Sequence, residues 1–378
     1  MPPKSLSARL PTAALSFRGY NVTNFGRTPE LLAHPTYGPR IEAQLRTVSA
    51  VAGDLLHRPV DLAGQVRAGQ EPTLEQYGEA LALLLAVESA QLALLRELFD
   101  VPWHTAKFSF GFSLGEIGAV IAGGVLDLVP ALEVLLPLAD DCVSLAYDAT
   151  LGVLFTRSRA VVIDDIRRLC LEVNQEGRGV VGISAQLAPN TLLAIGQHDT
   201  LDRLMARAAA ALDTRVHLRK NDFHWPPVHT PIVWQKQISN RAAQRMHTVR
   251  LNSGAPSPRV FSLVTGSYDY TPVTTRELLC QWIDHPQRLW DGIYETLASG
   301  VKTVLHVGPD PNIIPATFER LSANVVSQTH ESRSLRALSA AVRRLWLRRL
   351  LPYRAALLRA PYLEHIILED WLLANSPK

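Results

Sequence analysis

The sequence predicts an α/β protein in which a smaller α+β unit is inserted into a larger one. Short apolar strand candidates and amphipathic helices follow one another along most of the chain, a pattern typical of α/β folds. Between residues 179 and 229 the pattern changes to two strands, a helix and a third strand. The 378 residues fit two or three units of about 150 residues each, and 47% hydrophobic residues suffice for a sizeable core. A small scaffold held together by disulfides or metals is therefore excluded.

Charge and cysteine content narrow the class further. The 38 basic and 35 acidic residues leave a net charge of only +3, which does not indicate a nucleic-acid-binding protein. Cys142, Cys170 and Cys280 are widely spaced and form no metal-ligand pattern, so we expect reduced thiols, no metal and a cytoplasmic protein. The N-terminus lacks the apolar run of a signal peptide. Apolar stretches such as residues 125–139 are interrupted by charges and prolines, so we expect no transmembrane segment.

The elements of the large unit can be placed in order. We expect a strand at residues 13–17 that ends in a glycine turn and a polar loop, which is where α/β proteins place ligand contacts. A buried helix over residues 73–99, a strand at 106–110 and a helical stretch over 125–170 follow. The remaining expected elements are strands at 180–184, 191–196 and 215–220, a helix over 198–213 between the last two, helices over 230–249 and 276–282, strands at 260–264 and 303–307, and a helix before Gly300.

The strongest local signal for chemistry is the segment Gly111-Phe112-Ser113-Leu114-Gly115, a GxSxG pattern between a strand and a helix. A nucleophilic serine on such a cramped turn needs neighbours without side chains, so that the backbone can bend and the hydroxyl can stand clear. The helix that follows directs its first N–H groups, beginning with Leu114, at a developing oxyanion. The pattern predicts that Ser113 is a nucleophile.

A serine nucleophile needs a base, and two of the 12 histidines are candidates. His229 follows the third strand of the insert and precedes a helix, at a junction between the units. His224 is its rival in the same loop, and spacing alone does not decide between them.

A set of blocks in this sequence resembles the malonyl-CoA:acyl-carrier-protein transacylase family, which includes the acyltransferase domains of polyketide synthases. The blocks are GFSLGE, AVIAGGVLDL, VHTP after the insert, VTG, and VLHVGPDPNII, and they follow the family's order over roughly residues 13–328. The resemblance implies an α/β-hydrolase-like large subdomain with a parallel sheet and an inserted ferredoxin-like subdomain. The implied boundaries are 1–158 and 229–327 for the large subdomain, 159–228 for the small one, and 328–378 for a C-terminal extension.

The resemblance also implies the reaction. In the family an acyl-CoA acylates the serine, and the acyl group passes to the phosphopantetheine thiol of an acyl carrier protein, with histidine as general base. This assigns those roles to Ser113 and His229, with no bound cofactor and with the carrier protein, acyl-CoA and fatty acid or polyketide synthase components as partners. Two alternatives stay open. A hydrolase that clears acyl carrier proteins would be favoured by the loss of the carboxylate-binding arginine from the pocket. The sign of a non-catalytic partner-binding relative would be that Ser113 and His229 lie too far apart to interact.

Three further roles follow from the resemblance. A backbone carbonyl expected from Gln281 would hold His229. The oxyanion hole would use the N–H of Leu114 and that of Tyr20, although the loop FRGYNVTN departs from the family's PGQGSQ signature.

The acyl pocket is where this sequence departs most from the family. Arg157, with Arg159 as the alternative, would pair with a malonyl carboxylate. Phe112 stands where the family commonly has His and Val228 where malonyl enzymes have Phe, which makes the pocket more apolar. Malonyl remains the leading expectation for the acyl group.

The expected C-terminal extension has an arginine-rich segment with leucines at helical spacing. Its arginines are Arg333, Arg336, Arg343, Arg344, Arg348 and Arg349. Packing on the body with solvated arginines, docking of an acidic carrier protein, and binding to a membrane surface are the alternatives. We expect the segment at residues 362–373 to dock as a terminal helix.

Overall fold

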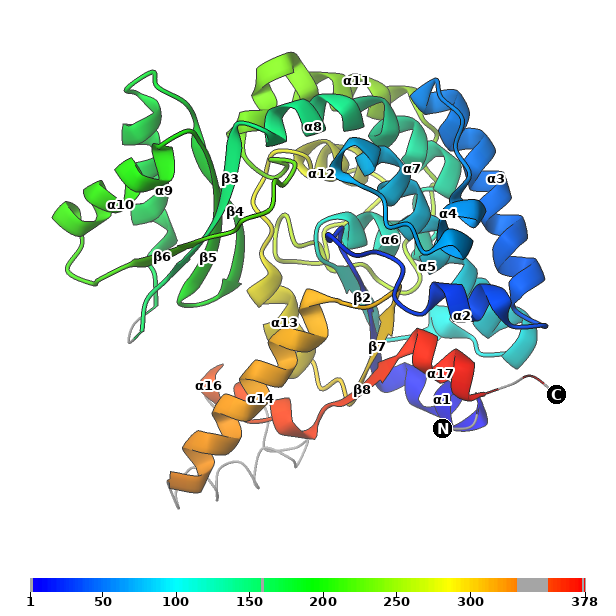
Figure 1. Cartoon of the computed structure of the whole chain (residues 1–378). Helices are drawn as coiled ribbons and strands as arrows, with labels where there is room; N and C mark the ends of the chain where they lie inside the picture. Colours follow the sequence, from blue (N-terminus) through cyan, green and yellow to red (C-terminus); the bar gives the residue numbers. More distant parts are fainter. Residues whose placement is uncertain (1–2, 158–159, 332–352, 376, 378) are drawn as a thin grey trace.

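The computed structural model describes residues 3–157, 160–331, 353–375 and 377, which form two four-stranded sheets (Figure 1). Sheet A has the strand order β2-β1-β7-β8 and is parallel throughout, and sheet B has the order β4-β5-β3-β6 and is antiparallel. The expected α/β class, with a parallel sheet in a large unit and a small inserted unit, is confirmed.

Sheet A is the centre of the large unit. Its strands are β1 (Ala13–Phe17), β2 (Phe108–Gly111), β7 (Thr303–Val307) and β8 (Glu364–Ile367). Every residue of β1, β2 and β7 is buried, as expected for a parallel sheet that helices cover on both faces. Leu15 and Phe17 pack into one core with α3 (Gly38–Leu56), α5 (Tyr77–Phe99) and α6 (Leu114–Ala122). Ala14 packs into a second core with α13 (Leu289–Ala298) and α14 (Ile313–Glu331).

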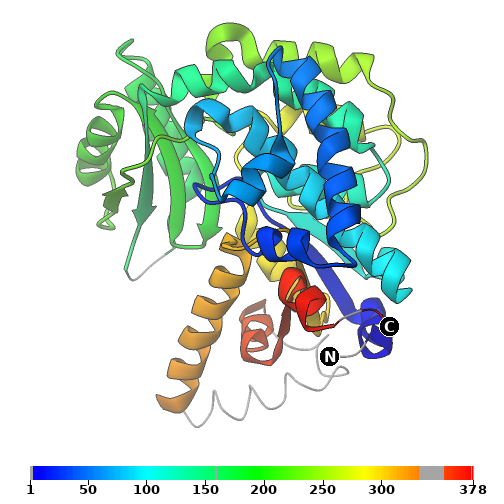
Figure 2. The ribbon, with the colours of Figure 1, turned by 45° about the vertical axis from the view of Figure 1, so that its right-hand side comes forward.

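The helices lie on both sides of this sheet (Figures 1 and 2). Those of the large unit are α1 (Pro3–Arg9), α2 (Thr28–Ala33), α3 (Gly38–Leu56), α4 (Leu62–Ala68), α5 (Tyr77–Phe99), α6 (Leu114–Ala122), α7 (Leu128–Leu135), α8 (Ala139–Ala146), α11 (Ile238–Thr248), α12 (Thr275–Gln281), α13 (Leu289–Ala298), α14 (Ile313–Glu331), α16 (Tyr353–Leu357) and α17 (Leu368–Ala374). Among the described helices, the stretch that ends with α5 is long and apolar enough to cross a membrane, but most of it is buried in the core of this protein.

The small unit contains sheet B and two helices on its outer face (Figure 1). Its elements are β3 (Ala149–Phe155), α9 (Ile163–Asn174), β4 (Val181–Ala188), β5 (Thr191–Gln197), α10 (Thr200–Ala211) and β6 (His217–Lys220). The expectation that residues 149–155 are helical and belong to the large unit is wrong, because β3 pairs with β5 on one side and β6 on the other. The sheet of the small unit thus begins before the expected boundary at residue 159.

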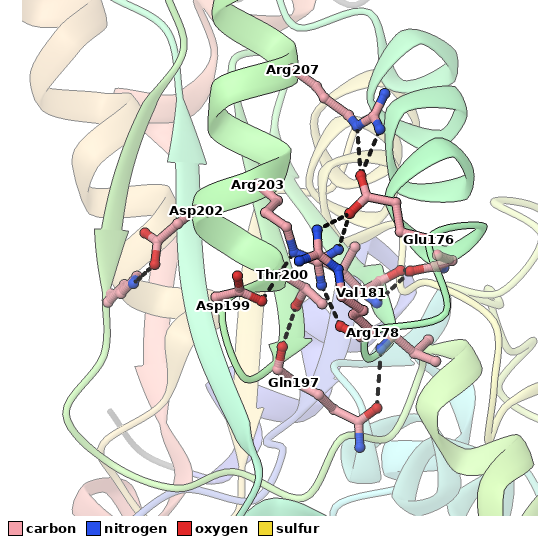
Figure 3. A network of polar contacts seen from close by, with 12 residues as sticks. Glu176, Arg178, Val181, Gln197, Asp199, Thr200, Asp202, Arg203 and Arg207 are labelled. Carbon is pink, nitrogen blue, oxygen red and sulfur yellow. Dashed lines mark hydrogen bonds and ion pairs between the residues drawn. The ribbon is translucent and has the colours of Figure 1, made fainter.

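Ion pairs join the two helices of the small unit (Figure 3). Glu176, just after α9, accepts hydrogen bonds from Arg203 and Arg207 of α10 and from Arg178. Hydrogen bonds from these guanidinium groups, that of Arg207 first, lower the pKa of Glu176 to about 2. Arg178 and Arg207 are 69% and 38% exposed, so solvent screens their pairs with Glu176, whereas Arg203 is only 14% exposed.

Two other expected elements differ from the structure. Residues 260–264 form isolated bridges instead of a strand. Val260 is bridged to Ser109 of β2, whose N–H donates to Arg259 O and whose carbonyl accepts from Phe261 N, and Ser262 is bridged to Ser267. Residues 362–373 are not one helix: β8 pairs along β7, and α17 follows it. This pairing gives hydrogen-bond partners to the backbone groups that β7 would leave unpaired if it were the edge of the sheet. The arginine-rich segment from Arg333 to Arg349 lies outside the described residues.

The C-terminal helix α17 should therefore contribute to the stability of the large unit. Leu372 is fully buried, so the substitution Leu372→Ala is expected to lower the free energy of unfolding by about 2–5 kcal/mol, as measured by urea denaturation. The neighbouring and only partly buried Leu373 provides the control, because Leu373→Ala should cost much less. Equal effects of the two substitutions would contradict this packing.

Candidate active site

The candidate nucleophile sits on a strained turn between β2 and α6. Ser113 has φ 55° and ψ −119°, a backbone conformation that is rare for a residue with a side chain. A Cβ on Gly111 would collide with the backbone of Gly115, and a Cβ on Gly115 would collide with the carbonyl of Phe17 at the end of β1. Both glycines of the GxSxG pattern are thus required by the close approach of three backbone segments.

Ser113 and His229 are brought together across 116 residues of sequence. The Ser113 Oγ and the His229 Nε2 are 2.8 Å apart. His229 is 3% exposed, and its Nδ1 lies 2.7 Å from the carbonyl oxygen of Trp282. Because a carbonyl can only accept, Nδ1 carries the proton and Nε2 is free to accept one from the serine. The sign expected of a non-catalytic relative, a wide gap between these two residues, is absent.

The expectation that the carbonyl of Gln281 holds His229 is wrong by one residue. The carbonyl of Gln281 accepts the N–H of His285 in the turn after α12. This leaves the next two carbonyls for the histidine: Trp282 O accepts from Nδ1, and Ile283 O accepts from the His229 N–H at 2.7 Å. The Gln281 side chain is exposed and donates to Glu277.

Burial sets the protonation state of the histidine. It lowers the pKa of His229 to about 4, despite the opposing hydrogen bond to the Trp282 carbonyl. The imidazole is therefore neutral at pH 7, which is the state a general base needs. His224, the rival candidate, lies elsewhere: its Nδ1 is 3.1 Å from the carbonyl of Ala146 at the end of α8.

The loop after β1 lies directly against the nucleophile turn. A Cβ on Gly19 would be 2.6 Å from the Phe112 carbonyl and 3.4 Å from the Ser113 Cβ. Arg18, 1% exposed, holds this loop by donating to the carbonyls of Gly19, Pro309 and Thr23. Burial lowers the pKa of Arg18 to about 10, so it keeps its charge at neutral pH. The Tyr20 ring packs edge-on against Tyr77 and Trp225.

Three further residues support the turn: Trp282 and Gln287 belong to no motif in the sequence, and Glu116 ends the GFSLGE block without a predicted role. The Gln287 Oε1 accepts from the Ser113 N–H at 3.3 Å, and the Trp282 Nε1 donates to the Ser113 carbonyl at 3.0 Å. Glu116, fully buried in the first turn of α6, accepts from Ser262 and Tyr270. Burial raises the pKa of Glu116 to about 7. Because the first two partners lie 174 and 169 residues away from Ser113, no local pattern can reveal them.

The residues expected to determine which acyl group binds do not all lie beside Ser113 and His229. Phe112 and Val228 are partly buried, each next to one member of the Ser113–His229 pair. Arg157 is exposed at the end of β3, and none of the contacts described for residues 3–157 and 160–331 joins it to Ser113. Arg159 lies outside the described residues. In the part of the chain that the structure describes, no cluster of His, Cys, Asp and Glu side chains could hold a metal ion.

The fold is similar to that of known malonyl-CoA:acyl carrier protein transacylase structures. An acyl carrier protein S-malonyltransferase from Vibrio cholerae has a TM-score of 0.63 at 19% identity, over 81% of this chain and 92% of that one. FabD from Acinetobacter baumannii has a TM-score of 0.62 at 17% identity, over 80% of this chain and 88% of that one. A malonyl-transacylase in complex with a type II polyketide synthase acyl carrier protein has a TM-score of 0.61 at 20% identity, over 81% of this chain and 91% of that one. No protein-family model and no curated protein matches the sequence.

The low pKa of His229 predicts an unusual pH profile for Ser113. The rate at which a fluorophosphonate labels Ser113, followed by intact mass, should be flat at neutral pH and fall only as the pH drops through about 4, where His229 becomes protonated. Circular dichroism at each pH controls for unfolding. A fall in rate centred near pH 6.5, the ordinary value for histidine, would contradict the effect of burial.

The hydrogen bond from Gln287 predicts a positioning effect on the same reaction. The substitution Gln287→Ala leaves the Ser113 N–H without its acceptor and should slow labelling of Ser113 about tenfold. Gln235→Ala is the matched control, since Gln235 bonds to Gln197 of the small unit instead. Equal labelling rates in the two variants would show that Gln287 does not position the nucleophile.

Proposed function

We propose that this protein is an acyltransferase that moves an acyl group from CoA to the phosphopantetheine thiol of an acyl carrier protein, through an ester on Ser113. The observation that carries the proposal is the contact of 2.8 Å between Ser113 Oγ and His229 Nε2, on a strained turn at the start of α6. The likeness in fold to enzymes named as acyl carrier protein malonyltransferases supports the choice of reaction.

The first half-reaction forms the acyl-enzyme. The Ser113 Oγ attacks the thioester carbonyl while His229 Nε2 takes its proton. The negative charge that develops on the carbonyl oxygen is stabilised by the N–H of Leu114, which as the first residue of α6 has no partner within the helix. The Tyr20 N–H is the proposed second donor. Collapse of the intermediate breaks the C–S bond, and the proton on His229 passes to the departing CoA thiol.

The second half-reaction reverses these steps with a different thiol. His229 takes the proton of the phosphopantetheine thiol, and the thiolate attacks the ester on Ser113. The C–O bond breaks, and the proton returns from His229 to the Ser113 Oγ. The same base thus serves both thiols, which is the basis of ping-pong kinetics.

In this reaction cycle a backbone carbonyl, in place of a carboxylate, holds the general base. The Trp282 carbonyl fixes the tautomer of His229 and orients its ring, as the aspartate does in a catalytic triad. Because it carries no full charge, it does not raise the histidine pKa enough to offset burial. His229 therefore returns readily to the neutral state between the two half-reactions.

The carrier protein and the cellular setting belong to the same proposal. Carrier protein as acceptor rests on the likeness to a transacylase solved with its carrier protein. Acyl-CoA is the donor, and no resident cofactor takes part in either half-reaction. We place the protein in the cytoplasm, where the thiols of Cys142, Cys170 and Cys280 stay reduced.

Intact-mass analysis with acyl-CoA thioesters tests the proposal. We expect one acyl adduct on the wild-type chain, none on Ser113→Ala, and a rate about 10²–10⁴-fold lower for His229→Gln. Adding a carrier protein that bears phosphopantetheine should discharge the adduct, whereas the same carrier without that group should not. If the adduct is lost at the same rate with and without the carrier protein, the protein is a hydrolase. If no adduct forms with any acyl-CoA, the proposal that the protein is an enzyme is refuted.

A further inference from the structure

A small apolar cavity shares two of its lining residues, Trp282 and Ile283, with the support of His229. Its volume is about 20 Å³, and side chains from α6, α7, α11, α12 and the turn after α12 line it. Ile117, Ala131, Leu138, Met246, Trp282 and Ile283 are among them, and none of its lining residues is charged.

Three of these lining residues connect the cavity to Ser113 and His229. Ile117 lies one helical turn after Ser113 on α6. Trp282 and Ile283 supply the two carbonyls that hold His229, and the Trp282 ring stands edge-on to the histidine ring with the centroids 5.0 Å apart. Trp282, which lines the cavity, contacts both Ser113 and His229, so the cavity lies one residue away from this pair.

We propose that this cavity receives the acyl chain, and that the substrate is a short, uncharged acyl thioester and not a malonyl thioester. This inference rests on the proposed function and specifies its substrate class. An ionised carboxylate in the cavity would lose its hydration without gaining a hydrogen-bond donor or a cation.

Three described arginines of the large unit bond to partners other than the cavity. Arg18 donates to three carbonyls and to Asn24. Arg241 of α11 pairs with Asp141 and also donates to the Pro137 carbonyl, and Arg245 donates to the Glu133 carbonyl. Arg157 lies exposed at the end of β3.

The volume of the cavity limits the length of the chain. About 10–15 Å³ of such space holds one water-sized group, so the cavity accepts about one or two methyl or methylene groups. An acetyl or propionyl chain meets this limit. Each methylene that is buried should raise the acylation rate about fourfold until the cavity is full.

A comparison of propionyl-CoA with malonyl-CoA tests the charge of the acyl group, since the two chains are similar in length. We expect acylation of Ser113, followed by intact mass, to be at least about 100-fold faster with propionyl-CoA. An equal or faster rate with malonyl-CoA overturns the inference and leaves the proposed function standing. No adduct with any thioester overturns both.

Two variants of opposite effect test the place of the chain. Ala131→Leu fills the cavity and should lower the ratio of the propionyl to the acetyl rate about fourfold or more. Val134→Ala enlarges it and should raise the butyryl rate relative to the propionyl rate by a similar factor. Because both rates in a ratio are measured on the same preparation, a fraction of misfolded protein lowers both equally and leaves the ratio unchanged.

The matched control for these variants is Ala209→Leu, on the exposed face of α10. It should leave both ratios as in the wild-type chain. If neither cavity variant changes its ratio, the acyl chain lies elsewhere and the inference is overturned.

Discussion

The contact between Ser113 and His229 depends on the strained conformation of one turn. Backbone strain at Ser113 persists only where the surroundings over-determine it, and here the turn is packed against the end of β1 and bonded to the side chains of Gln287 and Trp282. The same stretch after α12 presents the two carbonyls that hold His229. Segments far apart in the sequence must therefore all be in place before the nucleophile and its base can meet.

This dependence joins the two units of the protein. The backbone of Gln287 bonds to sheet B, since its N–H donates to Ser184 O and its carbonyl accepts the N–H of Gln186. Its side chain reaches the Ser113 N–H in the large unit. Ser184 also donates to the carbonyl of Val228, the residue before His229. The small unit is thus part of the support of both reacting side chains and not an independent appendage.

Patterns of neighbouring residues in the sequence predicted some of the strands, helices and site residues but not others. Strands at residues 13–17 and 303–307, the GxSxG turn and the helix over 200–211 follow from patterns of a few neighbouring residues. The strand β3 and the strand β8 were missed, because each is defined by partners that are distant in sequence. Trp282 and Gln287 were missed for the same reason. The resemblance implied Gln281, and the sequence does not reveal that the turn after α12 already uses the carbonyl of that residue.

The order of the strands in sheet A has a consequence for how the chain is made. The first strand, β1, is central: it lies between β2 and β7, and its Ser16 bonds to His306, 290 residues later. The edge strand β8 is added from residues 364–367. During synthesis β1 therefore leaves the ribosome long before most of its partners exist. A chaperone that shields this apolar strand would have to stay bound until β7 has been made.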